Sequence, residues 1–247
     1  MFPYKDELPT LRTPIVTFAL IAANVLSWVL IQGAGTDPLL QESVCTMGAI
    51  PGRVFGHIPA GSVVPLGRGM VCEVGSVPGW ATLFTSMFLH GGWMHLIGNM
   101  LFLWVFGNNI EDSTGRFRYL AFYLLCGLAA ALAQSVLNPE SRIPMVGASG
   151  AISGVMGAYI VLHPRTRVHM LVFLGIWITT IAVPAYLMLA YWFILQLLGG
   201  LPGLGKEVGG TAFLAHVGGF VAGVVLIMVF RNQRLLDLHP DRSSVRW

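Results

Sequence analysis

Long apolar segments alternate along the chain with short stretches rich in glycine, proline and charge. A helix needs about 17–25 apolar residues to cross the hydrocarbon part of a bilayer. We therefore predict an all-α, six-span helical bundle, with helices at about residues 14–32, 92–108, 118–137, 148–163, 184–199 and 211–230. Several of these spans are short, which suits a protein that thins the bilayer around it.

The segment from Val168 to Leu198 is the hardest to divide. It has 31 residues, too many for one ordinary span and barely enough for two. Pro184 suits a first helical turn, so we start the fifth span there. Residues 168–180 are then expected to lie along the membrane interface or to fold back into it. Two full spans here would give seven in all and move the C-terminus to the other side of the membrane.

The basic residues favour six spans. With the N-terminus inside, ten of them fall on the inner side and four on the outer side, as the positive-inside rule requires. The inner ten are Lys5, Arg12, Arg116, Arg118, Arg165, Arg167, Arg231, Arg234, Arg242 and Arg246, and the outer four are Arg53, Arg68, Arg142 and Lys206. We expect cytoplasmic tails at 1–12 and 231–247, a membrane domain over 13–230, and an outer loop, 33–82, that rests on the membrane surface without forming a domain.

Composition supports a membrane protein. The chain is 55% apolar and only 10% charged, with a mean hydropathy of +0.73, whereas a soluble domain carries about 25% charged residues. No obvious cleavage site follows the first apolar run, so we expect it to remain as a span. The net charge of +3 follows from loop asymmetry, and we predict no nucleic-acid partner. Whether Cys45 and Cys72, both in the outer loop, form a disulfide is left open by the sequence.

Polar residues inside the spans carry the candidate chemistry. His95 and Asn99 lie one turn apart in the second span, Ser149 opens the fourth, and His216 lies about five residues, or roughly 7 Å, into the sixth. Ionisable groups are costly within a membrane and are rarely there without a function. Because these three spans run in the same direction, all four residues are expected in the outer third of the membrane.

Small residues should let these spans meet. Gly150 and Gly154 on the fourth span, and Gly219 and Gly223 on the sixth, have the spacing that lets helix backbones touch. His216 is then the predicted general base for Ser149 as nucleophile. No Asp or Glu lies at this depth on these three spans, so a third, orienting carboxylate is missing.

The predicted oxyanion donors are Asn99, His95 and the Ser149 backbone N–H. Each residue also has a plainer explanation. Ser149 is suited to a helix N-cap, His216 to a hydrogen bond between helices, and His90 to a structural role at the interface. The supporting glycines Gly147, Gly150 and Gly219 would pack closely in either case. The joint occurrence of the serine, the histidines and the asparagine is what favours a catalytic site.

Three motifs resemble those of the rhomboid intramembrane serine proteases. They are Gly147-Ala-Ser149-Gly150, the second-span run from His90 through His95 to Asn99, and Ala215-His216 followed by Gly219 and Gly223. The resemblance covers about residues 80–230. It implies a six-span core open to the outside and single-span membrane-protein substrates cut near their outer ends. We also predict a bacterial inner-membrane location, with no metal and no cofactor.

Two positions depart from the family pattern. Family members often carry a Trp-Arg pair in the first outer loop, where this chain has Trp80-Ala81-Thr82. Some have an aromatic residue one turn after the nucleophile, where this chain has Ser153, so His216 must be held by other contacts. The alternatives are an inactive relative, usually marked by loss of Ser or His, and a transporter with a histidine proton relay. The oligomeric state and physiological substrate are not predicted.

Overall fold

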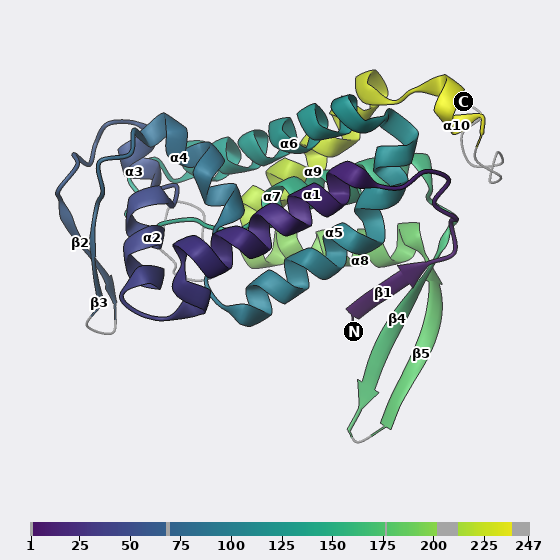
Figure 1. Ribbon diagram of the computed structural model, residues 1–247, viewed down its shortest axis with the longest axis horizontal. Helices are drawn as coiled ribbons and strands as arrows, with labels where there is room; N and C mark the ends of the chain where they lie inside the picture. The colour runs from purple at the N-terminus through teal and green to yellow at the C-terminus, as the bar shows by residue number, and fades with distance from the viewer. Residues whose placement is uncertain (1, 68–69, 176, 202–211, 239–247) are drawn as a thin grey trace.

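The computed structural model describes residues 2–67, 70–175, 177–201 and 212–238, and its centre is a bundle of long helices (Figure 1). These helices match the six predicted segments to within a few residues, except that α5 runs on to Thr114. They are α1 (Ile15–Leu26, continued by the π-helical turn η1, Ser27–Ile31), α5 (Trp93–Thr114), α6 (Arg116–Leu137), α7 (Ser149–Leu162), α8 (Ala185–Gly200) and α9 (Phe213–Phe230). Two of them, α6 and α9, are long and apolar enough to cross a membrane, while α1 with η1, α7 and α8 are shorter apolar helices.

Helices α7 and α9 touch through their backbones. A side chain added at Gly219 would collide with the carbonyl oxygen of Gly150, and one added at Gly223 with that of Gly154. A side chain at Gly157 would meet the Phe220 carbonyl in the same way. The close approach predicted from the small residues is therefore present along most of this helix pair.

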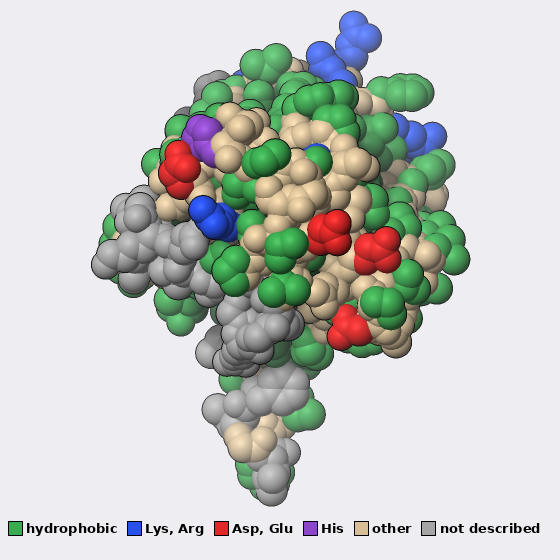
Figure 2. Space-filling view, turned by 90° about the vertical axis from the view of Figure 1, so that its left-hand side faces the viewer, with side chains coloured by type: hydrophobic (Ala, Val, Ile, Leu, Met, Phe, Trp, Pro, Cys, Tyr) green, Lys and Arg blue, Asp and Glu red, His purple; other side chains and the backbone are tan. Residues whose placement is uncertain are grey.

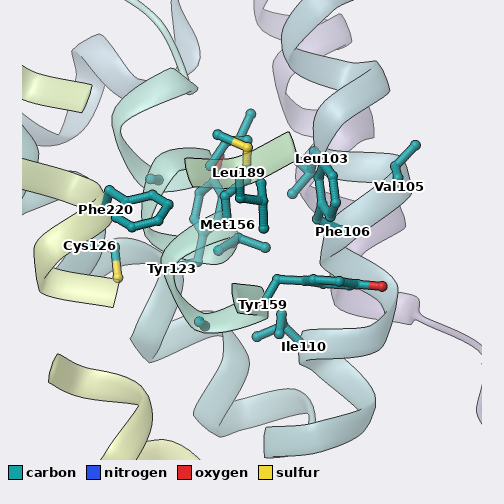
Figure 3. Packing of buried hydrophobic residues seen from close by; sticks show 14 of the residues in the cluster. Leu103, Val105, Phe106, Ile110, Tyr123, Cys126, Met156, Tyr159, Leu189 and Phe220 are labelled. Carbon is teal, nitrogen blue, oxygen red and sulfur yellow. The ribbon is translucent and has the colours of Figure 1, made fainter. Parts of the chain in front are cut away.

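Larger side chains fill the rest of the core. Phe106 of α5 and Tyr159 of α7 meet edge to face with ring centroids 5.0 Å apart, and Met156 and Leu189 lie nearby in the same cluster (Figure 3). Helix α8 packs on α9 through aromatic rings, as in the stacked pair Phe193 and Phe220 at 4.6 Å. The bundle thus combines one helix pair in backbone contact with neighbours held at side-chain distance.

The chain enters and leaves the bundle at one end, here called the tail end. The Glu111 carboxylate accepts hydrogen bonds from the Val16 and Thr17 N–H groups, at 3.0 and 2.8 Å, and so caps the start of α1. Asp112 accepts from the Leu11 N–H at 2.7 Å and pairs with Arg12. The start of the C-terminal segment is fixed there too, because the Asn232 N–H donates to the Ser113 carbonyl. The end is completed by the short helix α10 (Gln233–Leu236).

A three-stranded sheet at the tail end corrects the all-α prediction. Strand β1 (Phe2–Asp6) pairs antiparallel with β4 (Arg167–Leu174), which pairs antiparallel with β5 (Trp177–Pro184). The segment expected only to follow the interface is thus a β-hairpin, and the expected tail contributes a strand to it. Its valines, isoleucines and threonines favour extended backbone. Sequence reasoning had weighed only their apolar character.

Residues 33–82 were expected to form a loop on the membrane surface, and they form a small folded unit of short helices and strands instead. Its elements, together with the adjoining turn, are η2 (Gly33–Gly35), α2 (Leu39–Met47), α3 (Pro51–Val54), β2 (Val63–Gly67), β3 (Met70–Glu73), α4 (Gly79–Thr85) and η3 (Ser86–Phe88). Cys45 and Cys72 form a disulfide within its own hydrophobic core, which settles the open question. We call this the disulfide-linked unit. Figure 2 looks onto the end of the molecule that carries it, where acidic side chains lie among hydrophobic ones.

Candidate active site

Ser149 is the first residue of α7 and follows an extended segment that is fixed on both sides. Met145 exchanges two backbone hydrogen bonds with Ala49 of the disulfide-linked unit, and the Gly147 N–H donates to the Ser86 carbonyl at 2.9 Å. Gly147 has φ +128°, a conformation that favours glycine, and a Cβ there would lie 2.8 Å from the His95 ring. The glycine is therefore needed for the turn that presents Ser149.

His216 meets Ser149 from the first turn of α9. Its Nε2 lies 2.8 Å from the Ser149 Oγ. The start of α9 is held by Gln134 of α6, whose side-chain oxygen accepts from the Ala215 N–H at 3.3 Å. The serine hydroxyl is thus turned to the imidazole, and the N-cap position of α7 belongs to Ala148. The convergence expected from depth alone is present in the structure.

Helix α8 supplies two contacts to His216 that sequence reasoning missed. The His216 Nδ1 lies 2.8 Å from the Gln196 Oε1. The Gln196 side-chain NH₂ donates back to the Trp192 carbonyl at 3.4 Å, which leaves its oxygen facing the imidazole. The Trp192 ring lies beside the same imidazole, with centroids 5.9 Å apart. The available signal was that Gln196 is the one amide side chain in an otherwise apolar predicted span.

His95 and Asn99 lie on one face of α5 with donors left for a ligand. The His95 Nδ1 accepts from the Gly91 N–H at 3.3 Å, so a neutral ring carries its proton on Nε2, which lies on the side of the ring that faces Gly147. Asn99 is buried, and its Nδ2 makes no hydrogen bond within the described part of the chain. Both side chains line the cavity that Ser149 and His216 also line.

His90 supports this face rather than joining the cavity. It is fully buried, its backbone N–H and carbonyl both bond to the side chain of Gln32 at 2.8 Å, and its ring meets that of His95 edge to face with centroids 5.2 Å apart. Gly150 and Gly219 act at the α7–α9 contact, where their backbones touch.

The cavity at this end of the bundle has a volume of about 820 Å³. Its walls come from α5, α7, α8, α9 and the extended segment before α7, with Phe102, Met156 and Trp192 among the apolar lining residues. Among the described residues, no group of three or more His, Cys, Asp or Glu side chains is placed to hold a metal ion. A hydroxyl, an imidazole and unpaired N–H donors are the groups that acyl transfer requires.

The two family departures have structural counterparts. Ser153 does not reach His216; its hydroxyl donates to the Ser149 carbonyl at 2.6 Å, and Trp192 provides the aromatic contact instead. Trp80 on α4 is exposed. Near it, the Arg53 guanidinium donates to the Val77 carbonyl at 3.0 Å and ties α3 to the start of α4.

The fold and the site together define a bundle of apolar helices with a serine–histidine pair near one end. The family described as "Rhomboid domain" matches residues 78–233 of the chain, a stretch that includes all the site residues above. The chain therefore belongs to the rhomboid family, whose members are embedded in membranes.

Individual rhomboid proteins are also similar to this chain. "Rhomboid protease GluP" of Bacillus subtilis (strain 168) is 33% identical over 207 residues, which are 83% of this chain and 35% of that protein. "Rhomboid-like protein 11, chloroplastic" of Arabidopsis thaliana is 28% identical over 172 residues, 67% of this chain and 56% of that protein. "Putative rhomboid protease YdcA" of Bacillus subtilis (strain 168) is 36% identical over 110 residues, 43% and 54% of the two chains. The chain thus spans only about a third to a little over half of each of these relatives.

Proposed function

We propose that the protein is an intramembrane serine protease that uses Ser149 as nucleophile and His216 as general base to cut membrane-protein substrates. The observation that carries the proposal is the 2.8 Å contact between the Ser149 Oγ and the His216 Nε2. Membership of a family with members named as proteases supports it.

In the proposed reaction, His216 Nε2 takes the hydroxyl proton as the Ser149 oxygen bonds to the carbonyl carbon of the substrate peptide. The carbonyl oxygen becomes negatively charged and accepts hydrogen bonds from the Ser149 N–H, the His95 Nε2–H and the Asn99 Nδ2. His216 then returns the proton to the leaving amine, and an acyl-enzyme forms. A water molecule, deprotonated by His216, releases the acid and restores Ser149.

Gln196 takes the place in this scheme that a carboxylate occupies in soluble serine proteases. Its oxygen accepts from His216 Nδ1–H and so leaves Nε2 as the basic atom that faces Ser149. A neutral amide stabilises the imidazolium less than a carboxylate, but it avoids a buried negative charge within the bilayer. Trp192 limits rotation of the ring.

The proposed substrates are single-span membrane proteins cut near their outer ends. A helical peptide bond has its carbonyl engaged in the helix, so the segment must unwind before Ser149 can attack it. Substrates with Gly or Pro there, which weaken a helix by about 1 and 3 kcal/mol relative to Ala, should be preferred. A small residue should precede the cut, because the glycines around Ser149 favour close backbone approach without a deep pocket.

We further propose six spans with both termini in the cytoplasm, in the inner membrane of a bacterium. The ten-to-four distribution of basic residues supports this topology. So does the meeting of residues 11–12, 112–113 and 232 at the tail end. The Ser149 end of the bundle would then face outward.

The decisive test is cleavage of a model single-span substrate by the purified protein in detergent. Ser149→Ala and His216→Ala should each abolish cleavage, and the double variant should be no worse than either one because the two residues act as a unit. Ser153→Ala, a matched change one turn along α7, should keep most activity. Thermal melting would show that all variants fold.

Full activity in a folded Ser149→Ala variant would refute the assignment. No cleavage by the wild-type chain, with the substrate still bound, would favour the inactive, span-binding alternative.

A further inference from the structure

The hairpin of β4 and β5 has an apolar tip and a basic base. Trp177 and Ile178 at its tip are 74% and 65% exposed. Every residue of β5 from Trp177 to Ala182 is exposed. At the base, the side chains of Lys5, Arg165 and Arg167 are exposed as well, and the exposed carboxylate of Glu7 pairs there with His169.

This hairpin lacks the features that protect sheet edges in water. Strand β5 is the edge of the three-stranded sheet, so one row of its backbone groups is unpaired within that sheet. Water-soluble proteins guard such edges with charged side chains, yet the sequence from residue 168 to residue 205 contains no Asp, Glu, Lys or Arg. An uncharged edge ending in tryptophan and isoleucine is suited to contact with lipid instead.

The hairpin also extends in the direction that such contact requires. In Figure 1 it leaves the tail end and projects away from the side of the bundle, across the direction of the long helices, with its tip clear of them. When those helices cross a bilayer, the hairpin must run close to the membrane plane. The apolar outer surface of the bundle, which includes Tyr191 and Val229, belongs to the same lipid-facing side of the protein.

Two physical constraints determine how deeply the hairpin can enter the membrane. Unpaired backbone groups are not tolerated in the hydrocarbon core, so the open edge of β5 must stay near the headgroups. Tryptophan prefers this interfacial level, and each basic residue near an anionic surface contributes about 1 kcal/mol. Trp177 meets the first preference, and Lys5, Arg165 and Arg167 meet the second.

We propose that the β4–β5 hairpin is a membrane-binding element that seats its tip in the inner leaflet, at the boundary between headgroups and acyl chains. The basic residues at its base then lie on anionic lipid headgroups. The proposal is independent of the catalytic assignment; it rests on a membrane-embedded bundle and, for the choice of the inner leaflet, on the topology proposed above. It sets how far the tail end can tilt or sink in the bilayer.

The test places a spin label at Ile178→Cys in the full chain, reconstituted in vesicles of phosphatidylcholine with or without phosphatidylglycerol. Its collisions with oxygen, which concentrates in lipid, are compared with those with a water-soluble nickel complex. Gln233→Cys, exposed on α10 at the same end, is the matched control. A label at Thr179→Cys, also exposed near the tip, serves if Ile178→Cys does not fold.

The label on the hairpin should collide mainly with oxygen and the label at Gln233 mainly with nickel. Shielding from nickel should be stronger with phosphatidylglycerol, and Arg165→Gln with Arg167→Gln should remove that gain. Equal exposure of both labels to nickel in both lipids would overturn the proposal. Dipolar coupling between labels on two copies would overturn it too, because β5 would then pair with a second chain.

Discussion

Helix α9, which carries His216, contacts one neighbouring helix through backbone and another through side chains. On one side, α9 meets α7 with glycine against glycine, and the backbones themselves touch. On the other side, α8 reaches α9 only through long side chains, with Phe193 on Phe220 and Gln196 on the imidazole. A backbone contact fixes the relative positions of two helices, because nothing between them can rotate. A side-chain contact fixes the orientation of one ring. Catalytic activity should therefore fall sharply when the α7–α9 contact is disturbed and only moderately when the α8–α9 contact is.

Gly223→Val should have the largest effect. Even a Cβ at this position collides with the Gly154 carbonyl, so α7 and α9 must separate and carry Ser149 away from His216. We expect cleavage to fall by more than about 10³-fold, because loss of a nucleophile–base pair costs up to about 10⁶-fold in a soluble serine protease. Val225→Leu, on a 61% exposed residue of the same helix, should be nearly silent. Comparable activity of the two variants would show that the backbone contact does not position the site.

Asn99→Ala should have the second-largest effect. It tests an oxyanion donor on α5 and leaves the α7–α9 and α8–α9 contacts unchanged. Loss of one oxyanion donor typically lowers kcat by about 10²–10³-fold, because the charge it meets exists only in the transition state. The apparent KM for a single-span substrate should change little. A variant that raised KM and left kcat intact would place Asn99 in substrate binding instead.

Gln196→Leu should act more mildly. It removes the acceptor at His216 Nδ1 while leaving α7 and α9 in contact, and a typical hydrogen bond is worth about 1 kcal/mol, so kcat should fall roughly fivefold. Gln196→Glu restores an acceptor oxygen and should recover part of this loss, whereas a purely packing role would be served better by leucine. Leu197→Ala, on the exposed neighbour, is the control. Equal activity of the Leu and Glu variants would remove Gln196 from the mechanism.

The smallest effect on activity concerns the far end of α7, where Tyr159 donates a hydrogen bond to Asp6. Burial raises the pKa of Asp6 to about 6 despite the hydrogen bonds from Tyr159 and Asn109. The folded protein therefore binds a proton more tightly than the unfolded chain, so this contribution is greatest below about pH 4 and is lost as the pH rises through 6. Over the whole range the loss of stability is on the order of 3 kcal/mol.

The melting temperature in detergent, measured between pH 5 and 8, should show the upper part of this fall in the wild type. It should depend less on pH in Asp6→Asn. Glu7→Gln, on the half-exposed neighbour that pairs with His169, is the control. A wild-type curve that rises over this range would mean that the hydrogen bonds outweigh burial. Activity at a fixed pH should hardly change, since the contact lies at the tail end, far along α7 from Ser149.

Apolar length and small-residue spacing already determined the six helices and the α7–α9 contact, because both depend on regularities that repeat every turn of one helix. The order and spacing of the motifs likewise fixed which serine, histidines and asparagine to compare. Three features were decided only by the tertiary structure. The acceptor for His216 comes from α8, and a glutamine in one span carries no mark of which neighbour it faces. The Cys45–Cys72 disulfide needs the fold of residues 33–82 to bring the two sulfurs together. The hairpin at 167–184 has a local signal in its β-branched residues, but its place in a three-stranded sheet depends on β1, more than 160 residues earlier in the chain, and no local pattern specifies a partner so distant in sequence.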